Sequence, residues 1–166
     1  MRTLLIVGAL GIVVVSLTGC GNSSANASSE QALQRQADLY AIDEIEKKWH
    51  KATSNQDIDL MMSLWAPNAT LTVGPGETYV GKTEIRRFWL KSKVFQPENH
   101  WVSETPAYKI RITVNGDRGT LYFECHYVVP KTAKVIKTAG ADQQVARING
   151  RWLVTNHIGA SPALTP

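Results

Sequence analysis

The stretch that decides the fold is QQVARINGRWLVTNHI, which runs from Gln143 to Ile158. Two strand-like runs flank Asn149-Gly150, a pair of residues that favours a two-residue β-hairpin turn with positive φ angles. Counting outward from this turn, one residue at a time on each strand, sets Asp142 opposite His157. The sequence therefore predicts an antiparallel hairpin near the end of the chain, with a carboxylate facing an imidazole.

Two segments before this hairpin also alternate between apolar and polar residues. Tyr108 to Val114 alternates strictly, Asn115-Gly116 is a turn signal, and Leu121 to Val129 alternates again. A period of two residues is typical of strands that have one buried face. We therefore expect an antiparallel meander over the second half of the chain.

The first half of the chain has helical periodicity instead. Apolar residues recur at steps of three and four between Leu33 and Ser54, and the capping residues 55–57 precede a shorter helix that stops at Pro67. A small hairpin then leads to a third helix that starts at residues 81–83. Helices followed by a meander predict an α+β domain, with three helices packed on one face of a curved antiparallel sheet.

Three passages carry a family resemblance: Trp65 to Leu71, Gly81 to Ile85, and Asn149 to Val154. With the order of the elements, they resemble the SnoaL-like branch of the nuclear-transport-factor-2-like superfamily over residues 33–161. The resemblance implies a cone-shaped fold, in which the sheet wraps a long helix and leaves a pocket for a small, partly apolar molecule. Some members of the superfamily are isomerases, cyclases or dehydratases, and others are binding or regulatory modules.

No motif marks catalytic residues, so the candidates come from the faces of strands. Glu124 and His126 lie two residues apart in one strand, opposite its apolar face. They form an acid–base pair if their face lines the pocket, and they are solvated residues if it is the outer face. In the terminal hairpin, Asp142 would fix the tautomer of His157 and raise its basicity, although a single bulge would separate the two.

Aromatic and histidine side chains are the candidate walls of the pocket. The set comprises Trp49, Trp65, Tyr79, Trp89, His100 and Trp101. Three of the tryptophans fall on apolar helix faces, so core packing is their alternative role. The four histidines lack the close spacing of a metal-ligand set, and neither a metal nor another cofactor is expected.

The chain begins with the features of an exported lipoprotein. A basic start precedes an apolar run from Leu4 to Val15, which is too short to span a bilayer. Leu17-Thr18-Gly19-Cys20 resembles a lipobox, in which the cysteine carries lipid, and the alternative is an ordinary secretory signal that ends near a cysteine. We expect a signal peptide over residues 1–19, a lipidated Cys20 with a flexible tether over 20–32, the SnoaL-like domain over 33–161, and a tail over 162–166.

Partners and location follow from these features. Lipid on Cys20 would hold the domain at a membrane, on the periplasmic or cell-surface side, and outer-membrane sorting stays open because Gly21 replaces the Asp of an inner-membrane retention signal. After loss of residues 1–19 the chain has 17 basic and 14 acidic residues without long runs, which argues against a nucleic-acid partner. Cys125 then has no partner for a disulfide within the chain.

Three functions fit this sequence. The first is binding of a small, partly apolar molecule in the conical pocket. The second is a cofactor-free isomerase, dehydratase or cyclase that uses an acid–base residue of the pocket. The third is a protein-interaction module that forms a homodimer.

Overall fold

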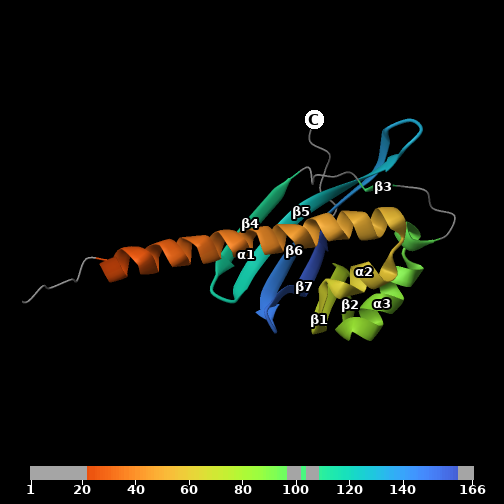
Figure 1. The fold of residues 1–166 in the computed structure, drawn as a ribbon. Coiled ribbons are helices and arrows are strands. Elements are labelled where there is room, and N and C mark those ends of the chain that lie inside the picture. Colours follow the sequence, from red (N-terminus) through yellow and green to blue (C-terminus); the bar gives the residue numbers. More distant parts are fainter. Residues whose placement is uncertain (1–21, 97–101, 104–108, 161–166) are drawn as a thin grey trace, which may run out of the picture.

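The computed structural model describes residues 22–96, 102–103 and 109–160, and its helices cover one face of a curved sheet (Figure 1). The helices are α1 (Asn22–Asn55), α2 (Ile58–Ser63), α3 (Gly81–Lys91) and the short 3-10 helix η1 (Lys93–Phe95). The strands are β1 (Trp65–Gly74), β2 (Glu77–Val80), β3 (Val102–Ser103), β4 (Ile110–Asn115), β5 (Arg118–Val129), β6 (Lys134–Ile148) and β7 (Arg151–Ala160). The predicted α+β class is confirmed.

The seven strands form one sheet in the order β2-β1-β7-β6-β5-β3, and β4 also pairs with β5. The meander from β4 to β7 is antiparallel, as predicted. The pairing of β1 with β7 is parallel, so the first and last strands meet in the middle of the sheet. This parallel junction brings the passage after α2 beside the end of the chain.

Helix α1 lies across the concave face of the sheet and buries one stripe of apolar residues there. Ile42, Ile45, Trp49 and Ala52 are buried at the predicted three- and four-residue spacing. The helix starts at Asn22, so the predicted tether over residues 20–32 is wrong from residue 22 onward. No glycine or proline interrupts residues 22–55, and good helix formers dominate residues 30–37, which explains why the helix continues beyond the sheet.

The exposed part of α1, residues 27–37, projects past the sheet (Figure 1). Over the described ranges, no helix combines the length and the apolar composition needed to cross a membrane. The predicted signal peptide, Cys20 and the predicted tail lie outside the described residues.

Helix α2 begins where capping chemistry predicts it. The Asp57 carboxylate accepts a hydrogen bond from the backbone N–H of Leu60 at 2.8 Å. The helix ends at Ser63, and Trp65, one of the three tryptophans predicted to lie on an apolar helix face, belongs to β1. The backbone N–H of Val154 in β7 donates to the carbonyl of Leu64 at 2.8 Å, so pairing with β7 outweighs the helical pattern here.

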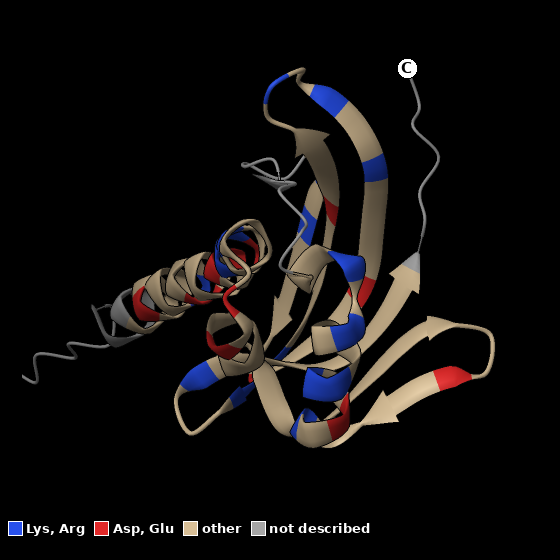
Figure 2. Cartoon of the chain, turned by 90° about the vertical axis from the view of Figure 1, so that its right-hand side faces the viewer, with Lys and Arg blue, Asp and Glu red and all other residues tan. Residues whose placement is uncertain are grey.

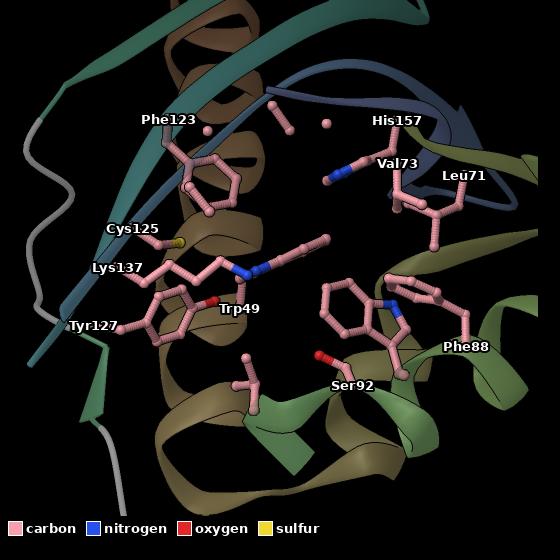
Figure 3. Close-up of a pocket in the computed structure, with 16 residues that line it drawn as sticks. Trp49, Leu71, Val73, Phe88, Ser92, Phe123, Cys125, Tyr127, Lys137 and His157 are labelled. Carbon is pink, nitrogen blue, oxygen red and sulfur yellow. The ribbon is translucent and has the colours of Figure 1, made fainter. Parts of the chain in front are cut away.

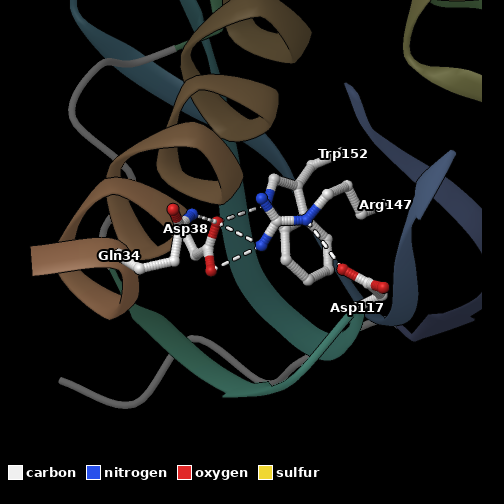
Figure 4. Close-up of polar contacts among 5 residues, drawn as sticks. All are labelled: Gln34, Asp38, Asp117, Arg147 and Trp152. Carbon is white, nitrogen blue, oxygen red and sulfur yellow. Dashed lines mark hydrogen bonds and ion pairs between the residues drawn. The ribbon is translucent and has the colours of Figure 1, made fainter. Parts of the chain in front are cut away.

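The middle of α1 is tied to the sheet by a buried carboxylate, Asp38 (Figure 4). The Arg147 Nη2 atom of β6 lies 2.7 Å from both Asp38 oxygens, and the Trp152 Nε1 atom of β7 donates to Oδ1 at 3.1 Å. Gln34 donates to the same oxygen at 3.0 Å, and Arg147 Nε lies 2.9 Å from Asp117 Oδ1 in the β4–β5 turn. This Asp38 cluster joins α1 to the turn and both strands of the last hairpin.

We expect Asp38→Asn to lower the free energy of unfolding by about 2 kcal/mol, because it leaves the partly buried Arg147 without its main counter-charge. Urea unfolding followed by circular dichroism measures the change. Arg86→Gln is the matched control, since it breaks an exposed ion pair with Asp59 and surface pairs contribute little. Equal stability of the Asp38→Asn variant and the wild type would contradict a structural role for this cluster.

Candidate ligand pocket

A cavity of about 210 Å³ lies between the helices and the concave face of the sheet (Figure 3). Residues from α1, α3 and η1 form one wall, and residues from β1, β5, β6 and β7 form the other. The lining residues are Trp49, Leu71, Val73, Phe88, Trp89, Ser92, Val94, Phe123, Cys125, Tyr127, Lys137, Ala139, Gly140, Ala141, His157 and Gly159. The sheet curvature and the position of α1 therefore create the hollow that the fold class implies.

Trp49 is the central aromatic residue of the pocket wall. Its ring centroid lies 5.2 Å from that of Trp89, 5.7 Å from that of Phe123 and 5.2 Å from that of His157. The Trp49 and His157 rings are stacked with an interplanar angle of 2°. These contacts join α1 to α3, β5 and β7, so they fix the shape of the apolar surface that a ligand would meet.

His157 is a buried titratable residue of the pocket wall. It is 6% exposed, and its Nδ1 atom lies 3.1 Å from the Gln143 Nε2 atom on the neighbouring strand. With the amide in this orientation, Gln143 donates to Nδ1 and the ring proton resides on Nε2. Burial lowers the pKa of His157 from 6.5 to about 3, so the imidazole is neutral at physiological pH.

Polar side chains gather at the mouth of the pocket. Lys137 of β6 lies directly opposite Tyr127 of β5, and both side chains reach the cavity together with the Ser92 hydroxyl at the end of α3 (Figure 3). Burial raises the pKa of Tyr127 well above its ordinary value, so its phenol stays protonated. The mouth therefore offers the ammonium group of Lys137 and the hydroxyl group of Ser92 to a ligand.

A second buried polar group lies behind the wall formed by Cys125. His50 Nε2 lies 3.0 Å from Glu46 Oε1, one helical turn earlier in α1, and 3.9 Å from Cys125 Sγ. All three side chains are at most 3% exposed. This arrangement pairs the polar groups of α1 with one another where the helix crosses β5, which avoids the cost of burying them alone.

Glu124 and His126 do not line the pocket. The side chains of Phe123, Cys125 and Tyr127 point into it, and successive residues of a strand face opposite sides. Glu124 accepts a hydrogen bond from the Tyr122 hydroxyl at 2.6 Å on the outer face. The interpretation of Glu124 and His126 as a pocket acid–base pair is wrong, and so is their description as solvated, because both are buried.

The predicted pair of Asp142 and His157 is also wrong. The hairpin turn forms as expected, with φ angles of 50° at Asn149 and 74° at Gly150, but the register shifts between Gln144 and Val145. His157 consequently lies opposite Gln143, and Asp142 lies opposite Ile158. The bulge turns His157 toward the pocket and leaves Asp142 exposed.

The structure places some of the aromatic residues that were predicted to line the pocket in its wall, and others elsewhere. Trp49 and Trp89 line the pocket. Trp65 is completely buried in the core beneath Trp49, which is its alternative role, and Tyr79 lies outside the pocket, where its hydroxyl donates to Glu77. His100 and Trp101 fall outside the described residues.

Several lining residues were not predicted. They are Leu71, Val73, Phe88, Ser92, Val94, Phe123, Cys125, Tyr127, Lys137 and the small residues of β6 and β7. The alternation of β5 contains a usable signal, because the more apolar of its two faces is the one that faces the helices. Within the described part of the chain, no three His, Cys, Asp or Glu side chains come together as a metal site would require.

Comparisons with known proteins agree with this architecture. A family model described as a SnoaL-like domain matches residues 47–154. No curated protein sequence matches the chain.

Solved structures share the fold at low sequence identity. An NTF2-like protein with a cystatin-like fold from Novosphingobium aromaticivorans is 15% identical, with a TM-score of 0.69 over 89% of this chain and 94% of that one. A cystatin-like-fold protein from Nostoc punctiforme is 20% identical, with a TM-score of 0.63 over 78% and 95%. A hexachlorocyclohexane dehydrochlorinase is 19% identical, with a TM-score of 0.63 over 81% and 92%. At these identities the likeness shows the fold alone.

The depressed pKa of His157 predicts a dependence of stability on pH. Between about pH 6.5 and pH 3 the unfolded chain binds a proton on this side chain and the folded chain does not, so acidification favours unfolding. Wild-type stability should fall in this range more steeply than that of His157→Gln, by up to about 1.4 kcal/mol per pH unit. Urea unfolding at a series of pH values gives both slopes, and parallel slopes would rule out a neutral, buried His157.

Proposed function

The chain belongs to the SnoaL-like domain family, and from this premise we propose that the protein binds a small, partly apolar molecule in the pocket between α1, α3 and strands β5–β7. The observation that carries the proposal is an aromatic cavity that contains a neutral imidazole. Ligand pockets combine mostly apolar walls with a few polar groups that orient the bound molecule. The rings of Trp49, Trp89 and Phe123 supply the walls, and His157 supplies a deep polar group.

The size of the cavity supports a ligand of about one ring. Its volume of about 210 Å³ exceeds the roughly 150 Å³ of an engineered cavity that binds benzene. It is smaller than the 300–1,000 Å³ or so of pockets for drug-sized molecules. A single ring with a short substituent fits this range better than a fused polycyclic molecule.

The protonation state of His157 supports binding over proton-transfer catalysis. A general base works best when its pKa is near the operating pH, and a group with a pKa of about 3 abstracts protons poorly. A neutral imidazole with its proton on Nε2 is a good hydrogen-bond donor to a ligand oxygen. The isomerase, dehydratase or cyclase alternative therefore lacks a strong base at this position.

We also propose that the domain is held at a membrane by lipid on Cys20. The lipobox-like residues 17–20 carry this proposal. Helix α1 starts two residues after Cys20, and its rise of about 1.5 Å per residue spans roughly 40 Å between Asn22 and Trp49. With lipid on Cys20, a helical rod would connect the anchor to the pocket.

Ligand binding can be tested by thermal unfolding of the full chain carrying Cys20→Ser, which removes the proposed lipidation site. The panel comprises neutral single-ring compounds such as phenol, indole and benzyl alcohol. A compound that binds the folded state should raise its stability by about 2.7 kcal/mol at a concentration one hundred times its dissociation constant.

The matched control pair is Ala139→Phe and Ala37→Phe in the same background. Ala139 lines the pocket, so a phenyl ring there fills the cavity and should abolish the ligand-induced shift. Ala37 is exposed on the projecting part of α1, and its substitution should leave the shift intact. A shift that survives Ala139→Phe would mean that the compounds bind elsewhere, and the absence of any shift across the panel would count against the proposal.

Lipid attachment can be tested by expression in a bacterium that processes lipoproteins, with metabolic labelling by a radioactive fatty acid. Wild-type chain should incorporate label and enter the detergent phase of a Triton X-114 partition, because two or more acyl chains anchor a protein stably. Cys20→Ser should lose the label and move to the aqueous phase. Cys125→Ser, which changes the buried cysteine, should behave like wild type, and unlabelled wild-type chain would refute the anchor.

A further inference from the structure

The charged residues around the pocket are mostly basic. Among the lining residues that the structure describes, Lys137 is a cation and none is a carboxylate. The two segments that border the mouth are also basic: residues 81–96 contain five basic and one acidic residue, and residues 127–139 contain three basic and none acidic. Figure 2 shows Lys and Arg along α3 and in the β5–β6 hairpin.

Lys137 is available to a ligand. It is an exposed residue, it forms no ion pair with any residue in the described part of the chain, and its side chain extends toward the cavity (Figure 3). Its position opposite Tyr127 places it on the concave side of β6. An ammonium group at the edge of an apolar cavity attracts an anion more strongly than one in open water, because the local dielectric constant is lower.

The other polar groups of the pocket can donate hydrogen bonds. The phenol of Tyr127 stays protonated, and the Ser92 hydroxyl points into the cavity (Figure 3). Hydroxyl and ammonium groups pair with acceptor oxygens, so a ligand that brings such oxygens would complement Ser92 and Lys137.

We propose that the ligand is a small monocarboxylic acid with an aromatic or alicyclic body, whose carboxylate pairs with Lys137 at the mouth. This inference rests on the proposed function of the same pocket. A cation would be repelled by Lys137, and a neutral hydrocarbon would leave the donors unpaired. A phosphate ester is disfavoured, because it carries up to two negative charges and the described lining residues include one cation, Lys137.

The test compares two probes of the same size and shape, 3-phenylpropanoate and 3-phenylpropanamide, at pH 7.5. Isothermal titration calorimetry on the full chain carrying Cys20→Ser gives both dissociation constants. The carboxylate should bind at least tenfold more tightly than the amide. The ratio should decrease when NaCl is raised to 0.5 M, because salt screens the ion pair at the mouth.

Lys137→Gln should weaken binding of the carboxylate to the level of the amide and leave the amide unchanged. Lys134→Gln is the matched control, since it removes the same charge from an exposed position of β6 that does not line the pocket. The Lys134→Gln variant should keep the tenfold preference for the carboxylate. This result would distinguish a direct contact with Lys137 from the general effect of the positive charges around the pocket.

Each other outcome overturns the inference in a distinguishable way. Equal affinities for the two probes, or a preference that survives Lys137→Gln, would mean that the pocket binds a ligand without recognising its charge. Failure of both probes, with binding of the neutral panel compounds, would reject the carboxylic acid and retain the proposed function. Failure of every compound would reject both.

Discussion

The packing of Trp49 against four other rings fixes the position of the helical layer relative to the sheet. Its indole contacts Trp65, Trp89, Phe123 and His157, which belong to β1, α3, β5 and β7. Aromatic pairs at centroid distances of about 5–6 Å combine area burial with a preferred geometry, so each contact restricts the position of a different element. The Asp38 cluster holds α1 at the opposite end of the sheet. These two contacts fix the position of α1 over the sheet, and the pocket lies beside Trp49.

The position of His157 depends on one extra residue in β7. The sequence correctly predicts the strands and the Asn149-Gly150 turn, because alternation and turn chemistry are local. The bulge at Thr155 depends on contacts that are distant in sequence. Strand β7 also pairs in parallel with β1, where the Thr70 hydroxyl donates to the Asn156 side chain at 2.6 Å. Pairing with a strand more than 80 residues away decides the register, and a shift of one residue moves a side chain to the other face of the sheet. Counting from the turn therefore could not place His157 on the pocket side.

The identity of the pocket residues was predictable only where periodicity separates the two faces of an element. The apolar face of β5 and the apolar stripe of α1 follow from spacing, and they contain Phe123, Cys125 and Trp49. A buried aromatic residue can belong to the solid core, like Trp65, or to the pocket wall, like Trp89. The difference depends on where the helices and the sheet separate, and the spacing of residues in the sequence does not reveal this. Lys137 was not predicted as a pocket residue, because β6 is longer than its alternating sequence suggests. The pairing of β6 with β5 also has an irregularity beside Tyr127, which determines the residue opposite Lys137.

The gradient of polarity along the pocket determines how a charged ligand would lie in it. The inner part of this cavity disfavours charged groups. Burial alone lowers the pKa of His157 to about 3 and keeps its imidazole neutral. The same desolvation cost applies to any ionised group of a ligand, and it is smallest at the mouth, where the ammonium group of the exposed residue Lys137 can compensate it. A ligand with one anionic end would therefore enter with its apolar end first, stack its ring near Trp49, and leave its charge beside Lys137. The neutral His157 then meets the apolar end of the ligand, or a neutral oxygen attached to it, and not the charged end.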